Sequence, residues 1–262
     1  MIFDAHFHLP VCLERGLPLV KDDYAAITCA HSESEWNVQY DFFKDSDGKH
    51  GPYYLSFGLH PQSALFSNTE SILQSADFLE GLLKEGKVNA IGEAGFDYFT
   101  PQFKESAALQ EKMWQIQLEL ALAFQKPLVV HCRKANHKLF EYSRLLKKCP
   151  AVLFHSFMGP YSEAKSLLNH EINGYFSFGK QMKNNNKKVI ECVKNLPLEN
   201  LLLETDAPFQ TLKGEENTLP LEINSVYREA FRLRGQNEVE NYEDFCLALE
   251  KNAASLLGIL WE

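Results

Sequence analysis

Short apolar segments that favour β-structure recur along the chain, and longer segments with helical character separate most of them. Eight such segments are 2–6, 24–30, 53–58, 88–93, 127–132, 151–156, 172–178 and 200–205. Several of them are almost continuously apolar, which is typical of parallel strands covered on both faces. Eight strands that alternate with helices favour an α/β fold, a single (β/α)8 TIM barrel with its helices outside the strands.

The predicted helices carry recognisable end signals. The segment 69–86 ends at Gly86, and glycine is the residue type that most often terminates a helix. The segment 103–125 is followed by Pro127, where the next strand is expected to begin. Two more helices, at 219–235 and 241–258, follow the eighth strand, so we expect an extra C-terminal helix beyond the barrel.

The length of the chain agrees with this fold. Its 262 residues match the roughly 250 residues that are typical of such a barrel. No low-complexity segment, repeat or linker divides the sequence, so residues 1–262 are expected to form one domain. A doubly wound open sheet is the alternative, but no GxGxxG motif follows the first strand.

Composition limits the cellular context. No apolar run approaches the ~18 residues that a membrane span requires, and no secretory signal is visible. The six cysteines are scattered without a CxxC pair, which is typical of reduced thiols in a cytoplasmic protein. The net charge of −9 argues against non-specific binding of nucleic acid over the whole surface, but it does not exclude a nucleic-acid enzyme.

Two histidines stand near the N-terminus in the motif DAHFHL, residues 4–9. If this segment is a strand, side chains at alternate positions share a face, so His6 and His8 project to the same side. Neutral imidazole is the commonest transition-metal ligand, and two imidazoles make half of a site. Histidines also occur in strands as ordinary hydrogen-bonded residues, so further ligands must come from other strands.

Further candidate ligands stand at the ends of other predicted strands, and this end of a barrel (the rim) is where active sites are built. They are Glu93, His131, His155 and Asp206, from the fourth, fifth, sixth and eighth strands. Four imidazoles and two carboxylates exceed the needs of one tetrahedral ion, so we expect a site for two divalent metal ions. Nitrogen and oxygen ligands without a thiolate suit Zn, Mn or Mg.

Two of these residues are also the candidate catalytic groups. Glu93 has two oxygens and a central strand, which suits a bridge between two ions. Asp206 can bind a metal ion and accept a proton from the water that acts as nucleophile.

The motifs DAHFHL, GLHP, IGEAGFDYF, VVHCRKA, FHSFMG and LLLETDAPF resemble, in order and spacing, those of the TatD-type metal-dependent deoxyribonucleases. That family belongs to the amidohydrolase-like metallohydrolase barrels. The resemblance extends from residue 2 to NAASLLG near the C-terminus. It implies that the family's metal ligands correspond to His6, His8, Glu93, His131, His155 and Asp206. It also implies metal-dependent hydrolysis of phosphodiester bonds in DNA, often as a 3′ exonuclease.

The sequence departs from the common family pattern in the predicted rim loops. Pro10 stands where many members carry an acidic residue, and Phe209 replaces the usual tyrosine after ETDAP. The segment KGEENTLP fits the Asn-x-Pro element of the family only loosely, and a longer segment separates the second and third strands. These departures bear on substrate preference rather than on metal binding.

Three more polar residues have two interpretations each. His60 in GLHP either contacts the scissile phosphate or is a turn histidine held by Gly58 and Pro61. Arg133 has a planar guanidinium that suits a phosphate of the substrate, and the alternative is an ion pair with a carboxylate of the rim. Glu204 either orients a metal-bound histidine or makes a structural hydrogen bond inside the barrel.

The predicted loop after the seventh strand is rich in lysine. Its lysines are Lys180, Lys183, Lys187 and Lys188. Loops at this position of the barrel often bind phosphate, so these cations can contact a DNA backbone. The alternative is an ordinary solvated surface.

Aromatic residues follow the predicted ligand of the fourth strand. Phe96, Tyr98 and Phe99 can stack on an unpaired base, and the alternative is core packing of at least two of them. Four histidines outside the constellation are assigned no role. They are His31, His50, His137 and His170.

These patterns favour a cytoplasmic, monomeric two-metal nuclease that acts on DNA, either single-stranded DNA or 3′ ends, without a membrane partner. The alternative is a metal-dependent hydrolase of a small cyclic amide or phosphoester. Amide-cleaving relatives often bridge their metals with a carbamylated lysine on the fourth strand, where this chain has Glu93. A non-catalytic binding protein is disfavoured, because the full set of ligands is intact.

Overall fold

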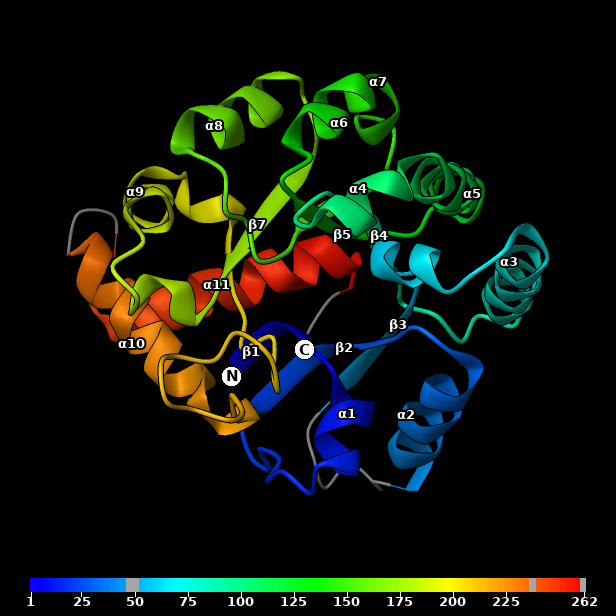
Figure 1. Ribbon diagram of the computed structural model, residues 1–262. Coiled ribbons are helices and arrows are strands. Elements are labelled where there is room, and N and C mark those ends of the chain that lie inside the picture. Colours follow the sequence, from blue (N-terminus) through cyan, green and yellow to red (C-terminus); the bar gives the residue numbers. More distant parts are fainter. Residues whose placement is uncertain (46–51, 236–238, 260–262) are drawn as a thin grey trace.

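Eight parallel strands form one sheet in which each strand pairs with its neighbours in the sequence. A computed structural model describes residues 1–45, 52–235 and 239–259. Its strands are β1 (Ile2–Phe7), β2 (Tyr24–Ala30), β3 (Tyr53–Phe57), β4 (Ala90–Asp97), β5 (Leu128–Arg133), β6 (Val152–Phe154), β7 (Gly174–Phe178) and β8 (Leu201–Leu203). Helices surround the strands, so the protein is a (β/α)8 TIM barrel, as predicted (Figure 1).

The helices alternate with the strands and continue beyond the last one. They are α1 (Leu9–Glu14), α2 (Glu33–Asp45), α3 (Thr69–Lys84), α4 (Pro101–Glu105), α5 (Ala107–Phe124), α6 (Asn136–Glu141), α7 (Ser143–Leu146), α8 (Tyr161–Asn169), α9 (Lys187–Asn195), α10 (Ile223–Arg234) and α11 (Tyr242–Leu257). Short 3-10 helices are η1 (Pro61–Leu65), η2 (Lys180–Met182), η3 (Leu198–Asn200) and η4 (Pro220–Glu222).

One predicted helix is in fact two. The sequence predicted a continuous helix over 103–125, but α4 ends at Glu105 and α5 begins at Ala107. The Ser106 hydroxyl between them donates to the carbonyl oxygen of Phe103 at 2.8 Å. Such a bond from a side chain to the nearby backbone competes with the helical ladder, which accounts for the break.

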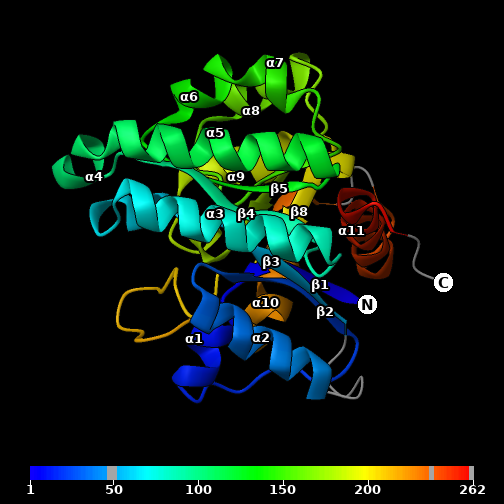
Figure 2. The same ribbon diagram turned by 90° about the vertical axis from the view of Figure 1, so that its right-hand side faces the viewer.

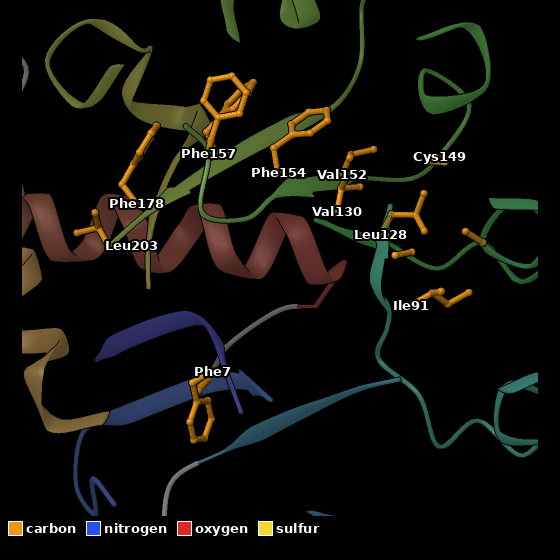
Figure 3. Packing of buried hydrophobic residues seen from close by; sticks show 14 of the residues in the cluster. Phe7, Ile91, Leu128, Val130, Cys149, Val152, Phe154, Phe157, Phe178 and Leu203 are labelled. Atoms are coloured by element: carbon orange, nitrogen blue, oxygen red, sulfur yellow. The ribbon is translucent and has the colours of Figure 1, made fainter. Parts of the chain in front are cut away.

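A large apolar cluster packs between the outer face of the strands and the helices. Leu128 and Val130 of β5 lie beside Val152 and Phe154 of β6 in this layer (Figure 3). Trp114 of α5 is fully buried in the same cluster. The burial of these apolar side chains fixes the helices around the barrel and leaves its rim to the connecting loops.

A second cluster fills the interior of the barrel with the other face of the strands. Phe3 and Ala5 of β1 belong to it, and so do Ala253 and Leu256 of α11. The last helix therefore closes the end at which the strands begin, which confirms the extra C-terminal helix. Figure 2 places α11 at the opposite end of the barrel from the loop that follows β8.

The barrel closes where its first strand meets the residues just beyond its last. The Asp206 N–H donates to the His6 carbonyl oxygen at 2.9 Å, and the His8 N–H donates to that of Ala207 at 2.8 Å. We call this junction the β1–β8 seam. It lies at the level of three of the predicted metal ligands.

An extra residue in β1 changes the direction in which the following side chains of this strand point. Residues 4–7 of β1 pair with residues 26–28 of β2, so β1 holds one residue more than its neighbour. Ala5 faces the interior, and regular alternation would turn His6 and His8 away from it. Because of the bulge, both imidazoles point into the barrel.

A similar bulge in β4 places Glu93. Residues 91–94 of β4 pair with residues 128–130 of β5. The prediction that this strand ends at Glu93 is wrong, because β4 continues to Asp97. A Cβ atom at Gly92 would lie 2.4 Å from the Val129 carbonyl oxygen, so only glycine permits this close approach to β5.

The described residues also bear on the cellular context. All six cysteine side chains are free thiols, as their scattered spacing predicted. In the described parts of the chain, no helix has both the length and the apolar character that crossing a bilayer requires.

Candidate metal centre

The Glu93 carboxylate lies at the centre of a buried group of imidazoles. Its Oε1 is 3.0 Å from His6 Nε2 and 3.3 Å from His8 Nε2. Its Oε2 is 2.8 Å from His155 Nε2 and 3.0 Å from His131 Nδ1. The two oxygens therefore face two different pairs of nitrogen atoms.

Asp206 joins the first of these pairs. Its Oδ1 is 3.3 Å from His8 Nε2 and 3.7 Å from His6 Nε2. The Asp206 backbone has φ 53°, a left-handed conformation that is unfavourable for residues other than glycine. Its hydrogen bond in the β1–β8 seam helps to hold this conformation. The structure thus brings together the donor cluster, which we define as His6, His8, Glu93, His131, His155 and Asp206.

Asp97 orients one of these imidazoles, although the sequence analysis gave it no role. The Asp97 Oδ2 is 3.1 Å from His131 Nε2, while the Nδ1 atom of that ring faces Glu93. An ionised carboxylate only accepts, so Nε2 donates to Asp97, and in the neutral ring Nδ1 is the nitrogen left for a metal ion. Burial raises the pKa of Asp97, but the bonds from His131 and Gln62 outweigh it and lower the pKa to about 2. Glu93, Gly95 and Asp97 are spaced two residues apart in β4 and therefore lie on one face of the strand. This spacing was the signal in the sequence that could have identified Asp97.

His60 combines both of its predicted interpretations. Its Nδ1 accepts the Gln62 N–H at 3.2 Å at the start of η1, so the neutral ring carries its proton on Nε2. That Nε2 lies 3.3 Å from Glu93 Oε2. Burial lowers the pKa of His60 to about 3, so the ring is neutral near pH 7. The residue shapes the turn and also presents an N–H group to the donor cluster.

His31 also faces the donor cluster, although the sequence analysis placed it outside the constellation. Its Nε2 is 3.4 Å from Glu93 Oε1. His31 directly follows β2, and the rule applied to the other strand ends would have found it. His137 and His170 are exposed, and His50 lies outside the described residues.

A cysteine fixes the bulge that carries Glu93. Cys29 Sγ accepts the Glu93 N–H at 2.9 Å, and its S–H donates to the Gly92 carbonyl oxygen at 2.7 Å. Both backbone groups are buried and would otherwise need other partners. The thiol therefore has a structural role beside the donor cluster.

A glutamine in the loop after β8 contacts two carboxylates. Gln210 Nε2 donates to Asp206 Oδ2 at 3.0 Å and to Glu204 Oε1 at 2.9 Å. Ser177 Oγ donates to Glu204 Oε2 at 2.5 Å, whereas His155 Nδ1 is 3.8 Å away, beyond hydrogen-bond distance. Burial raises the pKa of Glu204 to about 8. Of the two interpretations of Glu204, the structure shows the second, in which its carboxylate accepts hydrogen bonds inside the barrel.

Burial and mutual contact set the charges of the donor cluster. Burial alone would raise the pKa of Glu93, but the imidazoles of His155 and His6 outweigh it and hold the pKa well below its usual range. Burial lowers the pKa of His6 to about 4, although Glu93 opposes this. Burial also lowers the pKa of His155, but Glu93 outweighs it and raises the pKa to about 9. The ionised Glu93 beside the neutral His6 is the protonation state that metal binding needs.

The donor set fits divalent metal ions. Several trios of side chains have ligand atoms within 4.8 Å of one another. They are His6–His8–Glu93, His6–His155–Asp206, Cys29–His31–Glu93 and His60–Glu93–His131. His6 Nε2 and His8 Nε2 are 3.2 Å apart, and both face one oxygen of Glu93. Converging lone pairs repel one another, and a cation among them turns this repulsion into attraction.

Comparison with known proteins identifies the family. The sequence matches the profile of the TatD related DNases over residues 3–258. The chain belongs to this family. With the buried donor cluster, this makes the protein a TatD-family metal-dependent hydrolase.

Curated TatD-family relatives match different shares of the chain. The uncharacterized metal-dependent hydrolase YabD of Bacillus subtilis is 28% identical over 99% of this chain and 100% of its own. The 3'-5' ssDNA/RNA exonuclease TatD of Edwardsiella piscicida is 33% identical over 60% of this chain and 58% of its own. The human 3'-5' RNA nuclease TATDN2 is 32% identical over 59% of this chain, and the match spans only 20% of TATDN2.

A solved TatD-family structure has the same fold. The crystal structure of YJJV, a TatD homologue from Escherichia coli K12, matches with a TM-score of 0.81 and 22% identity. The match covers 99% of this chain and 98% of that chain. It supports the assignment of the barrel.

In this TatD-family barrel, Arg133 lies on the surface of the rim. Its guanidinium carbon is 3.5 Å from the centre of the Phe99 ring, and both side chains are exposed. Within the described ranges, Arg133 forms no ion pair with a carboxylate, so the alternative interpretation is not observed. Phe96 is fully buried and Tyr98 packs against the core, so the prediction of core packing is confirmed for these two.

The lysine-rich loop is only partly available to a ligand. Lys180 is 0% exposed, and its Nζ lies 2.5 Å from Glu215 Oε2 and 2.8 Å from Glu222 Oε2. A contact of Lys180 with DNA is therefore ruled out, because this cation is buried between two carboxylates. Lys187 and Lys188 are exposed at the start of α9.

Proposed function

We propose that this TatD-family hydrolase is a nuclease that cleaves phosphodiester bonds of DNA at a two-metal site, with single strands or 3′ ends as substrate. The central position of Glu93 carries the proposal, because Oε1 faces His6 and His8 whereas Oε2 faces His131 and His155. This is the arrangement expected of a carboxylate that bridges two ions. The name of the Edwardsiella relative, a 3'-5' ssDNA/RNA exonuclease, supports the choice of substrate.

The donors would divide between two ions. His6, His8 and Asp206, with Glu93 Oε1, would hold one ion. The second would be held by His131 and His155 with Glu93 Oε2. Zn, Mn and Mg all accept such nitrogen and oxygen ligands. When bound, divalent ions neutralise charge on the phosphodiester and lower the pKa of the nucleophilic water.

The side chains of the protein supply the remaining chemistry. Asp206 accepts the proton of the attacking water as general base. Gln210 binds the Oδ2 atom of Asp206 and thereby leaves Oδ1 directed toward the donor cluster. The Nε2–H group of His60 donates to an oxygen of the scissile phosphate, and Arg133 contacts a neighbouring phosphate.

The proposed setting follows from the same observations. All members of the donor cluster come from one chain, so we propose that a monomer is active. Six free thiols favour the reducing cytoplasm as its location.

The first test is degradation of a 3′-labelled single-stranded oligonucleotide with Mg, Mn or Zn, against a control with EDTA. Loss of terminal nucleotides in the presence of metal is the expected result. Replacing Asp206 by Asn removes the general base, so kcat should fall about 10²- to 10⁴-fold. Replacing the exposed His170 by Asn is the matched control and should leave kcat unchanged, because this residue lies outside the donor cluster.

Two results would contradict the proposal. Substantial turnover in the Asp206→Asn variant would exclude this residue as the general base. An intact oligonucleotide after incubation with folded, metal-loaded protein would exclude the nuclease. Hydrolysis of a small cyclic amide or phosphoester in that case would establish the alternative function.

A further inference from the structure

Phenylalanine side chains are exposed at the rim around the donor cluster. In the described part of the chain, Phe66, Phe99 and Phe209 lie in loops that follow β3, β4 and β8. They are 90%, 49% and 42% exposed, respectively. Exposed aromatic surface beside a reactive cluster indicates contact with a ligand, because leaving such surface in water costs free energy.

Two of these rings are each paired with a guanidinium group. The Arg133 guanidinium carbon lies 3.5 Å from the centre of the Phe99 ring. That of Arg15 lies 5.6 Å from the centre of the Phe209 ring. Each pair thus offers an exposed aromatic surface and a cation with planar hydrogen-bond donors side by side.

The two pairs lie on opposite sides of the donor cluster. Phe99 and Arg133 follow β4 and β5, whereas Phe209 follows β8 and Arg15 follows α1, next to β1. The strands are arranged in sequence order around the barrel, so β4 and β5 lie across from β8 and β1. The Phe209 ring centre is 4.9 Å from that of His8, so this pair contacts the donor cluster directly.

Contacts at both sides fix the loop between β8 and α10, which carries one of these rings. Arg15 Nη1 donates to Asn217 Oδ1 at 2.6 Å. On the other side, the buried Lys180 pairs with Glu215 and Glu222. A ring on such a fixed loop loses little conformational freedom when a ligand binds.

We propose that the Phe99–Arg133 and Phe209–Arg15 pairs bind nucleotides of a single-stranded nucleic acid on the two sides of the donor cluster. Each ring stacks on an unpaired base, and each guanidinium contacts a phosphate. This inference rests on the proposed nuclease function. The chain has a net charge of −9, so attraction for phosphate must come from local cations such as these. Bases in a duplex are already stacked and paired, so the proposed site selects single strands or frayed ends.

The direct test is a binding measurement in the Asp206→Asn background, which keeps the strand intact. We would titrate a 5′-labelled oligothymidylate with metal-loaded protein and follow fluorescence anisotropy. Replacing Phe99 or Phe209 by Leu should raise Kd about 5- to 50-fold, because stacking on that ring is lost. Replacing Arg15 or Arg133 by Gln should reduce the slope of log Kd against log salt by about 0.7 per phosphate contact.

Phe43 provides the matched control. It is an exposed phenylalanine near the end of α2 that lies away from the rim. Replacing Phe43 by Leu should leave Kd unchanged. A blunt duplex of the same length should bind more weakly than the single strand, and this preference should be lost in the Phe99→Leu/Phe209→Leu double variant.

Two outcomes separate this inference from the proposed function. The protein could hydrolyse phosphodiesters while Phe99→Leu and Phe209→Leu bind the single strand as tightly as Phe43→Leu does. That result would refute the proposed nucleotide-binding site and support the nuclease function. If the protein hydrolyses no phosphodiester but both phenylalanine variants bind the single strand more weakly, the nucleotide-binding site is supported and the nuclease function is refuted. Equal affinity of the protein with all four rim residues intact for duplex and for single strand would also refute the proposed nucleotide-binding site.

Discussion

Gln210 is not a candidate ligand, yet its side-chain amide contacts both carboxylates at the end of β8. The donation from Nε2 to Asp206 Oδ2 leaves that carboxylate with one oxygen directed toward His8. Ser156 Oγ also lies 2.8 Å from this nitrogen, so the amide nitrogen is surrounded by three oxygen atoms. The orientation of Asp206, the proposed general base, thus depends on a residue outside the donor cluster.

Replacing Gln210 by Leu keeps the size of the side chain and removes its hydrogen bonds. We expect kcat to fall about 10- to 100-fold, the value of a hydrogen bond to a charged group, with a smaller change in KM. Steady-state kinetics on an oligonucleotide measures both quantities. Replacing the exposed Gln115 on α5 by Leu is the control, and an unchanged kcat in the Gln210 variant would exclude the positioning role.

At the scale of elements, periodicity predicted the barrel and the ends of its strands supplied the donor cluster. The bulges in β1 and β4 could not be predicted, because they depend on pairing with β2 and β5. Without them, alternation from the buried Ala5 and Ala90 would turn His6 and Glu93 away from the interior. The end of β4 was misplaced for the same reason, and Asp97 was missed with it.

The burial of Lys180 could not be predicted from the sequence either. Its carboxylate partner Glu215 is 35 residues away in the sequence, so nothing local distinguishes this lysine from its exposed neighbours. The ion pairs connect η2 to the loop between β8 and α10. Such a contact becomes visible only when both loops are placed on the barrel.

The Lys180 ion pairs predict that replacing the lysine and replacing its carboxylate partners reduce the stability of the fold by different amounts. Replacing both Glu215 and Glu222 by Gln leaves a buried ammonium without an anionic partner, so unfolding should become easier by about 3–5 kcal/mol. Replacing Lys180 by Met leaves carboxylates that can reach water, and an apolar replacement of a buried ion is often close to neutral, so the loss should be below about 1 kcal/mol. Urea unfolding measures both values, and equal losses would refute this explanation.

At the scale of the molecule, the donor cluster joins five strands or strand ends around the barrel. Metal ions that bind only the folded state stabilise it by about 2.7 kcal/mol at a hundred times Kd. For a chain of this size, we expect Mn or Zn to raise the unfolding temperature by about 5–10 °C. Calorimetry with and without EDTA measures this shift. The Glu93→Gln variant should show a much smaller shift, and an equal shift would place the ions elsewhere.

The β1–β8 seam has a consequence for protein synthesis. A chain that has left the ribosome only as far as β7 already contains five of the six proposed ligands, since His155 precedes β7 and Asp206 follows β8. It lacks both Asp206 and the residues that close the barrel against β1. We therefore expect translation that stops before residue 206 to release no active hydrolase.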